Sequence, residues 1–298
     1  MKILLVGYNP SDKYSGVFLR NVQQALTVAN ISFETRTPDQ LGNVSRFDIA
    51  IGAGDEIFRK SPEFVREIKS QGVVTADFRT KFLPRKPKAL IKHVLQPAIE
   101  KCDYVLTHQE QKLAGTFFVG QGVDETLLFP EQDEILTVLI DHWFPKRRIS
   151  LNSILAAAKD LHGSKAKVRI WYHNHTGIAE NTFDESAQQY KLIPFPELAS
   201  YYRRTHVFLP THRETQGVVG AEVGMCGGLT LLEKWMYPAK TIQHIPHRIY
   251  SNGSIPWPET ANHVDIVANR KFTKQHYGIE AFSERIATAL ETIMATHS

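Results

Sequence analysis

Two glutamates, Glu214 and Glu222, stand with seven residues between them in a stretch that reads PTHRETQGVVGAEVGMCGG. The apolar run at 206–210 predicts a buried strand before them, and the small apolar residues that follow predict a helix starting near Gly217. Ionised carboxylates only accept hydrogen bonds, and hydroxyl groups donate them, so the pair suits a ligand with many hydroxyls. Because the helix is apolar almost all round, Glu222 is expected on a buried element.

The start of this helix is a candidate phosphate site. Backbone N–H groups in a first helical turn lack intrahelical partners and lie at the positive end of the helix dipole. We expect Gln216, Gly217 and Val218 to meet phosphate oxygens there, with glycine allowing close approach to the backbone. A phosphate beside a polyol indicates a nucleotide sugar. The competing interpretation is that both glutamates are solvated surface groups.

A basic loop, Lys146, Arg147 and Arg148, follows the apolar run at 135–140, which predicts another strand. Parallel sheets bind ligands at the carboxyl ends of their strands, where an anionic donor would need cations. A solvated basic loop is the competing interpretation.

These segments resemble the GT-B fold glycosyltransferases, specifically the retaining type of family 4. That family's signature, E-G-F-G-x-P-x-x-E-A-M-A-C-G, is similar to E-T-Q-G-V-V-G-A-E-V-G-M-C-G at 214–227. Three further stretches, at 120–130, 135–161 and 193–210, resemble family segments in the same order. The resemblance implies retaining transfer of a sugar from a nucleoside-diphosphate donor, expected to be a UDP-sugar, to an acceptor hydroxyl. It implies no metal and no cofactor besides the donor.

The resemblance also implies roles for the signature residues. Glu214 is expected to hold hydroxyls of the transferred sugar, and Glu222 the ribose hydroxyls. The backbone amides of Gln216, Gly217 and Val218 are expected to meet the diphosphate.

Cations complete the implied donor site. Arg147 corresponds to the family's lysine, and His142 stands in place of its arginine. Lys146 and Arg148 lie beside them, so stabilisation of the departing diphosphate would be shared in this loop. Together with Glu214, the expected catalytic residues are therefore Arg147 and His142. Gly16, before the first predicted helix, corresponds to a glycine turn near the phosphates.

One family feature is missing from the first domain. The family commonly has a histidine near the reacting sugar, whereas the corresponding GVVTADFRT stretch has none. Asp77 and Asp55 are both open as replacements.

Alternating apolar runs and helical stretches predict an α/β protein with parallel sheets covered on both faces. The fold class expected is two Rossmann-like domains facing a central cleft, as in GT-B. The domains expected are 1–131 on the acceptor side and 132–278 for the nucleotide sugar. A final helix, 279–298, is expected to pack back on the first domain.

Composition agrees with a globular protein of two domains. The chain has 298 residues, of which 42% are hydrophobic and 22% charged. No signal peptide or membrane-spanning run is evident, and Cys102 and Cys226 suggest no disulfide framework, so a cytoplasmic location is expected.

The acceptor is less defined. Between Arg79 and Lys101 the chain has seven Lys or Arg residues and one acidic residue, Glu100. A phosphate-bearing acceptor would meet this segment, either DNA with a hydroxymethylated base or an anionic lipid. The residues expected to contact it are Arg79, Lys81, Arg85, Lys86, Lys88 and Lys92. Two alternatives remain: a solvated loop here, and a non-catalytic nucleotide- or glycan-binding module overall.

Overall fold

The chain is described from a computed structural model. The structure describes residues 1–7, 14–53, 57–79, 96–108, 113–142, 151–164, 167–174, 177–180, 194–211, 218–233, 243–251 and 254–297. These residues form two compact units, and each is considered by itself. Unit 1 comprises Met1–Gly122 and Ile279–Ser298, and unit 2 comprises Val123–Gly278.

Unit 1 is built on a sheet of six parallel strands in the order β2-β1-β3-β4-β5-β6. The strands are β1 Lys2–Val6, β2 Ser32–Arg36, β3 Ile49–Ala53, β4 Val74–Arg79, β5 Tyr104–Thr107 and β6 Thr116–Phe118. The helices are α1 Tyr14–Val28, the short 3-10 helix η1 Pro38–Gln40, α2 Ile57–Lys60, α3 Pro62–Ser70, α5 Gln96–Ile99 and α11 Ile279–His297.

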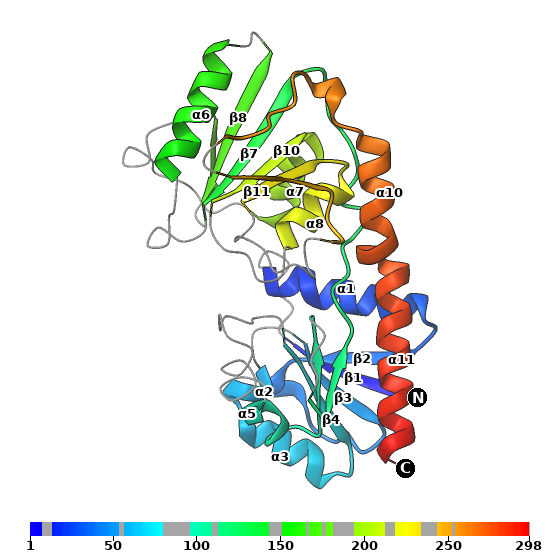
Figure 1. The fold of residues 1–298 in the computed structure, drawn as a ribbon. Coiled ribbons are helices and arrows are strands. Elements are labelled where there is room, and N and C mark those ends of the chain that lie inside the picture. The colour runs from blue at the N-terminus through cyan, green and yellow to red at the C-terminus, as the bar shows by residue number, and fades with distance from the viewer. Residues whose placement is uncertain are drawn as a thin grey trace. The chain divides into compact units, whose positions relative to one another are not determined.

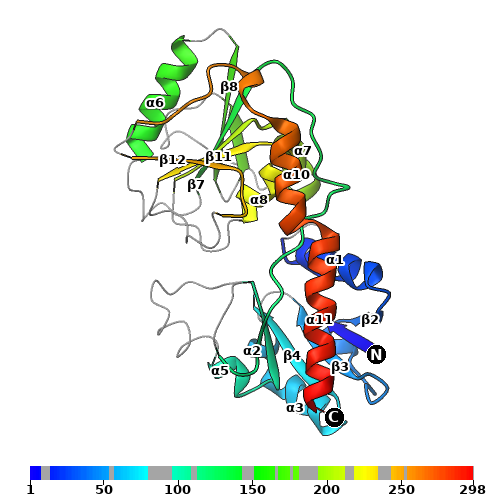
Figure 2. The same cartoon turned by 45° about the vertical axis from the view of Figure 1, so that its right-hand side comes forward.

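Both faces of this sheet are covered, because its strands are apolar on both sides. One face packs on α1 and α11 through a core that includes Leu5, Phe18 and Phe282. The other face packs on α2 and α3, with Leu4 and Phe58 in that core. Figures 1 and 2 show α11 beside α1, although the two helices are far apart in the sequence.

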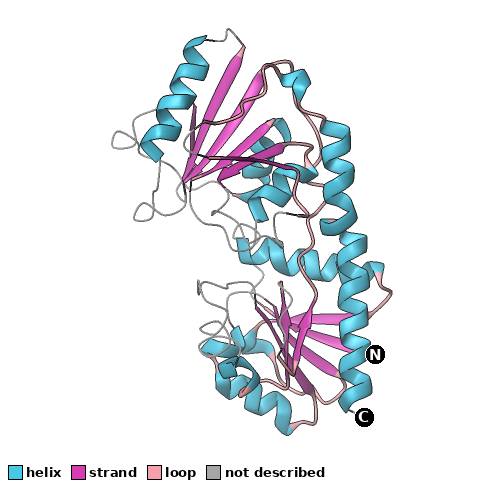
Figure 3. Cartoon of the chain, viewed as in Figure 1, coloured by secondary structure: helices cyan, strands magenta, loops and turns pink. Residues whose placement is uncertain are grey.

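Unit 2 has a second six-stranded sheet, in the order β12-β11-β10-β7-β8-β9. The strands are β7 Leu136–His142, β8 Val168–Asn174, β9 Gly177–Glu180, β10 Val207–Pro210, β11 Leu229–Glu233 and β12 His247–Tyr250. The helices are α6 Leu151–Ser164, α7 Phe195–Arg204, α8 Val218–Met225, the short 3-10 helix η4 Ala261–His263 and α10 Ile266–Tyr277. Figure 3 shows the strands of both sheets in magenta.

The two faces of the unit 2 sheet are also covered. Ile154 and Ala158 of α6 pack on one face with alternate residues of the strands, such as Val138 and Leu231. Helix α8 contacts β11 on the other face, where a Cβ at Gly220 would lie 3.4 Å from Thr230 Oγ1.

One strand differs from the predicted parallel pattern. β9 pairs with β8 in the antiparallel sense, with Trp171 opposite Glu180. The strand is short and carries a single strongly apolar residue, Ile178, so its sequence lacks the alternation that identifies strands. Edge strands β2 and β12 escape prediction for a related reason, because many of their residues are exposed or half-buried.

Residues 123–131 belong to unit 2, whereas the sequence-based prediction placed them in the first domain. Their backbone is tied to α10 and α7: Val123 N–H donates to Tyr277 O, and Glu131 N–H donates to Arg203 O. The predicted fold class, α/β with two Rossmann-like units, is confirmed. In the part of the chain that the structure describes, no helix has the length and apolar character needed to cross a bilayer.

Candidate functional site

The carboxyl edge of the unit 2 sheet collects the segments that the sequence assigned to the donor. β10 is paired in parallel with β7 on one side and β11 on the other, and Pro210 lies in register with Asp141. Parallel neighbours end at the same edge, which is where open α/β sheets bind ligands. The chain therefore leaves β7 and β10 at adjacent points of this edge.

The loops that follow these two strands carry most of the predicted donor site. Six of its residues lie outside the described part of the chain: Lys146, Arg147, Arg148, Glu214, Gln216 and Gly217. His142 is the last residue of β7, and its side chain is also outside what is described. Their predicted roles rest on the sequence, and the structure adds the adjacency of the strand ends.

Helix α8 begins at Val218 and is buried along almost all its length. Glycines let it approach its neighbours closely. A Cβ at Gly224 would lie 2.6 Å from Thr273 Oγ1 of α10, and one at Gly220 would lie 3.3 Å from Ile245 Cγ2. These two glycines thus have a packing role, since they let α8 sit against α10 and the sheet.

Glu222 lies in this apolar helix and is only 3% exposed. An ionised carboxylate at such a position is costly unless donors or cations surround it. The charge of Glu222 affects the pKa of Cys226, one helical turn later. Burial raises the pKa of the Cys226 thiol, Arg270 opposes that rise and Glu222 adds to it. The helix that starts at the strand edge therefore carries an acidic group inside the unit.

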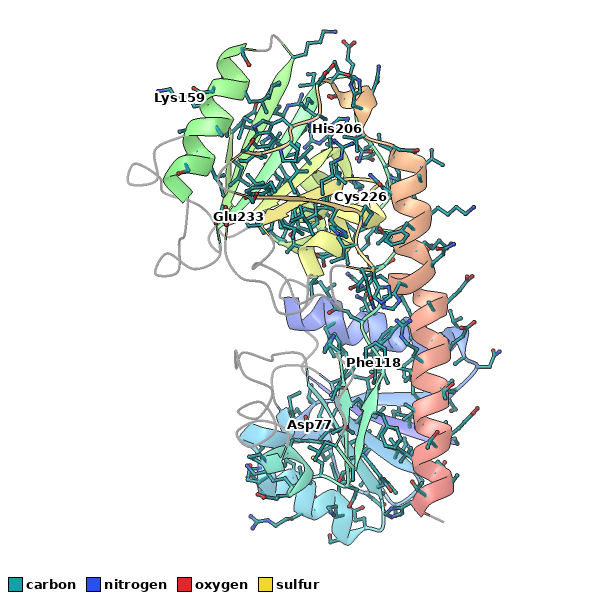
Figure 4. The ribbon with its side chains drawn as sticks, viewed as in Figure 1. Asp77, Phe118, Lys159, His206, Cys226 and Glu233 are labelled. Atoms are coloured by element: carbon teal, nitrogen blue, oxygen red, sulfur yellow. The ribbon has the colours of Figure 1, made fainter. Side chains whose placement is uncertain are left out.

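Two polar side chains at this edge were missed by sequence reasoning. Glu233 and Tyr250 are the last residues of β11 and β12, lie in register, and are 8% and 4% exposed. Burial, and secondarily the charge of Glu233, raises the pKa of the Tyr250 phenol. Figure 4 labels Glu233 at its strand end. The signal was present, because the predicted strand GLTLLE ends on this glutamate.

Unit 1 places different chemistry at its carboxyl edge. Gly16 is the third residue of α1. Asp77 lies within β4, is 1% exposed, and points to the opposite face from Phe78, which packs in the α1 and α11 core. Asp77 is labelled in Figure 4. Asp55 lies outside the described residues.

The residue directly after β5 is His108, whose ring packs among aromatic side chains. Its centroid lies 5.1 Å from that of Phe78, with the rings 23° from parallel, and 5.8 Å from that of Phe18. Burial lowers the pKa of His108 to about 3, so the ring is neutral at ordinary pH. No sequence motif marked this histidine.

The predicted acceptor-binding basic segment is mostly outside the described residues. Arg79 is the last residue of β4, with its side chain not described. The remaining members, which lie beyond the described range, are Lys81, Arg85, Lys86, Lys88 and Lys92.

A cavity of about 560 Å³ lies elsewhere in unit 2, between β12 and α10. Leu229, His247, Asp265 and Phe272 are among its lining residues. Leu229 and His247 are the first residues of β11 and β12, so the cavity is at the amino edge of the sheet. It is therefore separate from the edge at which parallel sheets bind ligands.

Comparison with known proteins gives structural neighbours at low sequence identity. No protein-family model and no curated protein sequence matches the chain. A candidate UDP-N-acetylglucosamine 2-epimerase from Listeria monocytogenes superposes with a TM-score of 0.58 at 13% identity, covering 98% of this chain and 96% of that one. The UDP-GlcNAc 2-epimerase of Neisseria meningitidis, bound to UDP-GlcNAc, gives 0.54 at 12%, covering 98% and 100%.

An alpha-glucosyltransferase in complex with UDP and a 13-mer DNA gives a TM-score of 0.51 at 11% identity, covering 96% of this chain and 93% of that one. These matches extend over nearly the whole of each chain, so they concern both units. At such identities the likeness is one of fold alone. The chain has the two-unit Rossmann-like fold of the GT-B proteins.

Proposed function

We propose that this protein is a glycosyltransferase that moves a sugar from a UDP-sugar to an acceptor hydroxyl, with retained anomeric configuration and without a metal ion. Unit 2 binds the donor and unit 1 binds the acceptor. The observation that carries this proposal is the adjacency of β7 and β10, in register from Val138 and Val207 to Asp141 and Pro210. The loop with the predicted diphosphate cations and the loop with the predicted sugar-binding glutamate start from neighbouring strand ends.

The buried acid of α8 supports the same proposal. Glu222 is 3% exposed in a helix whose first residue, Val218, comes directly after the glutamate loop. In the proposed complex its carboxylate accepts hydrogen bonds from the ribose hydroxyls, while the α8 N-terminus faces the diphosphate. An apolar helix that retains an acid at this place fits a ligand with hydroxyls and phosphates together.

The proposed reaction transfers the sugar from the diphosphate of the donor to the acceptor oxygen. The bond between the anomeric carbon and the β-phosphate oxygen breaks, and the acceptor oxygen forms a new bond to that carbon. The acceptor proton leaves with the diphosphate. Arg147, with Lys146 and Arg148, stabilises the negative charge that grows on the departing group. Glu214 orients the transferred sugar through its hydroxyls.

Two acceptor classes follow from the basic segment that begins at Arg79: DNA with a hydroxymethylated base, and a lipid in an anionic surface. The DNA acceptor has one further support, since an alpha-glucosyltransferase of similar fold has been seen with UDP and DNA. Duplexes with 5-hydroxymethylcytosine, and anionic vesicles with a lipid acceptor, separate the two classes.

A second candidate function is epimerisation of a UDP-sugar. It is favoured by the likeness to UDP-GlcNAc 2-epimerases, whose TM-scores exceed that of the glucosyltransferase. The two functions share the donor and differ in product. Incubation with UDP-GlcNAc would give its 2-epimer in one case, and free UDP with a glycosylated acceptor in the other.

Donor turnover tests the proposal. The protein is incubated with UDP-, GDP- and ADP-sugars, with and without the acceptors above, and the released nucleoside diphosphate is measured. We expect UDP release that persists in EDTA, an acceptor product of retained configuration by NMR, and loss of turnover in Glu214→Ala. Glu134→Gln is the matched control, because that glutamate of unit 2 is 76% exposed and paired with Lys167. Binding without turnover for every donor and acceptor would instead indicate a non-catalytic module.

A further inference from the structure

His108 occupies the carboxyl edge of the unit 1 sheet. It follows Thr107, the last residue of β5, and stacks on Phe78 of the neighbouring strand β4. Phe18, from the first half of α1, completes the aromatic group. The helix that follows β1, the end of β4 and the end of β5 thus meet around this imidazole.

Among the residues that the structure describes, neither ring nitrogen of His108 has a hydrogen-bond partner, and both nitrogens are covered. The residue as a whole is only half-buried, so part of it reaches the surface. Native proteins satisfy nearly all buried polar side-chain atoms, and an exception in a folded protein calls for a reason. Phenylalanine or leucine would fill this aromatic environment without the desolvation cost of two nitrogens.

The chemical state of His108 limits what it could bind. Burial keeps the imidazole neutral, so one nitrogen donates a hydrogen bond and the other accepts one. Such a ring suits a neutral hydroxyl, which also donates and accepts. It does not suit a phosphate, since only one of its nitrogens donates and it has no charge to offer.

A second buried histidine shows that this fold can satisfy such a side chain. His206 of unit 2 is 1% exposed, and its Nδ1 accepts a hydrogen bond of 3.2 Å from Thr137 N–H. His206 precedes β10, so it lies at the amino edge of its sheet, where it serves the packing of β7 and β10. Of these two histidines, His108 at a carboxyl edge is the one whose nitrogens both have no partner among the described residues.

We propose that His108 is an acceptor-binding residue, which hydrogen-bonds the attacking hydroxyl on unit 1. The inference rests on the proposed function and adds to it a residue outside every motif of the sequence. Phe18 and Phe78 hold the plane of the ring, and the ligand hydroxyl supplies the partner that the described part of the chain does not. His108, and not Asp77, is then the group that stands in for the histidine missing from the β4 segment.

The test compares His108→Phe with His206→Phe. His108→Phe keeps the aromatic packing and removes two unsatisfied nitrogens, so we expect the Tm to rise by about 2–4 °C. UDP release from UDP-glucose, with water taking the place of the acceptor, should fall about tenfold or more in kcat. The affinity for UDP, measured by calorimetry, should not change. His206→Phe should lower the Tm and leave kcat unchanged.

The outcomes separate this inference from the proposed function. A wild-type protein that neither binds UDP nor turns over any nucleotide sugar overturns both. An active wild type whose His108→Phe variant is stabilised and equally active overturns the role of His108 alone, because the histidine is then a core residue. A stabilised variant with reduced kcat and normal UDP affinity supports both.

A measurement on the wild type covers the case in which His108→Phe does not fold. In protein labelled with ¹⁵N-histidine, the ring nitrogen signals of His108 are followed on adding UDP alone, and then UDP with either glucose or a 5-hydroxymethylcytosine duplex. We expect both nitrogens to shift when the hydroxyl compound is added. If UDP binds and neither hydroxyl compound moves these signals, the inference is wrong.

Discussion

The carboxyl edges of the two sheets differ in the set of polar side chains that they bury. In unit 2 this region holds Glu222 and Glu233, which are 3% and 8% exposed. In unit 1 the corresponding edge holds the neutral imidazole of His108, which packs beside Phe18 and Phe78, and one buried carboxylate, Asp77, which is 1% exposed. Two six-stranded sheets therefore present different chemistry at their carboxyl edges.

The difference teaches what each edge could recognise. Buried carboxylates are stable only beside hydrogen-bond donors or cations. The carboxyl edge of unit 2 therefore suits a ligand with many hydroxyls, together with loops whose sequence is rich in arginine and lysine. A neutral ring in an aromatic setting suits one uncharged hydroxyl. This contrast agrees with the proposed division into a donor unit and an acceptor unit, and the following predictions test it.

The largest effect is expected at the charged edge. Glu222→Gln keeps the shape of a side chain in α8 and removes its charge, so the affinity for UDP should fall about 100-fold, as hydrogen bonds to charged groups are lost. Calorimetric titration with UDP measures it, with Glu134→Gln as the exposed control. Unchanged affinity in Glu222→Gln would break the contrast, since the charge of Glu222 would then serve the fold alone.

A stability effect is expected where α8 meets α10. Gly224→Ala puts a Cβ 2.6 Å from Thr273 Oγ1, so we expect the free energy of unfolding to drop by about 1–3 kcal/mol in urea titrations. Gly163→Ala in α6 is the control, because a Cβ there would have no described atom within 4 Å apart from its chain neighbours and its own helix backbone. That variant should be stabilised by up to about 1 kcal/mol. Equal behaviour of the two variants would mean that α8 is not held closely at its glycines.

The two buried histidines make stability depend on pH. Burial lowers the pKa of His108 to about 3 and that of His206 to about 4, from about 6.5 in the unfolded chain. Below pH 6.5 the unfolded chain binds protons that the folded chain does not, so the free energy of unfolding falls as the pH falls.

Each histidine should contribute a slope of about 1.4 kcal/mol per pH unit well below pH 6.5. Urea titrations between pH 7 and pH 5 measure that slope. His108→Phe and His206→Phe should each reduce this slope by about 1.4 kcal/mol per pH unit, which corresponds to one fewer proton bound on unfolding. If His108→Phe leaves the slope unchanged while His206→Phe reduces it, then His108 is not neutral in the folded protein, and the contrast between the edges loses its basis.

The smallest effect is expected in the chemical labelling of the cysteines. Each unit has one buried cysteine, so the two units are alike in this respect. Cys102 and Cys226 are both buried, and burial raises the pKa of the Cys226 thiol, so little of the reactive thiolate forms. Iodoacetamide at pH 8 should label neither cysteine in the folded protein, and both in urea. Rapid labelling of Cys226 without urea would show that α8 opens easily, and its buried acid would then be accessible by local unfolding.

The elements that could be predicted from sequence are those with strong local patterns. The apolar runs gave β1, β3, β4, β7 and β10, and the all-apolar surroundings of Glu222 indicated a buried acid, which the structure places at 3% exposure. Strand β9 was missed because its sequence shows no alternation of apolar and polar residues. The packing role of Gly220 and Gly224 was also missed, because their neighbours come from other segments.

Sequence alone determined the α/β class, the division into two halves and the acid in α8, because these depend on hydrophobic periodicity and on residue types close together in the chain. Only the tertiary structure decided that β7 and β10 are neighbours, that Glu233 and Tyr250 end adjacent strands, and that His108 packs against two phenylalanines. These relations join residues far apart in the chain. They exist only when parallel strands are ordered in a sheet, and no local pattern records that order.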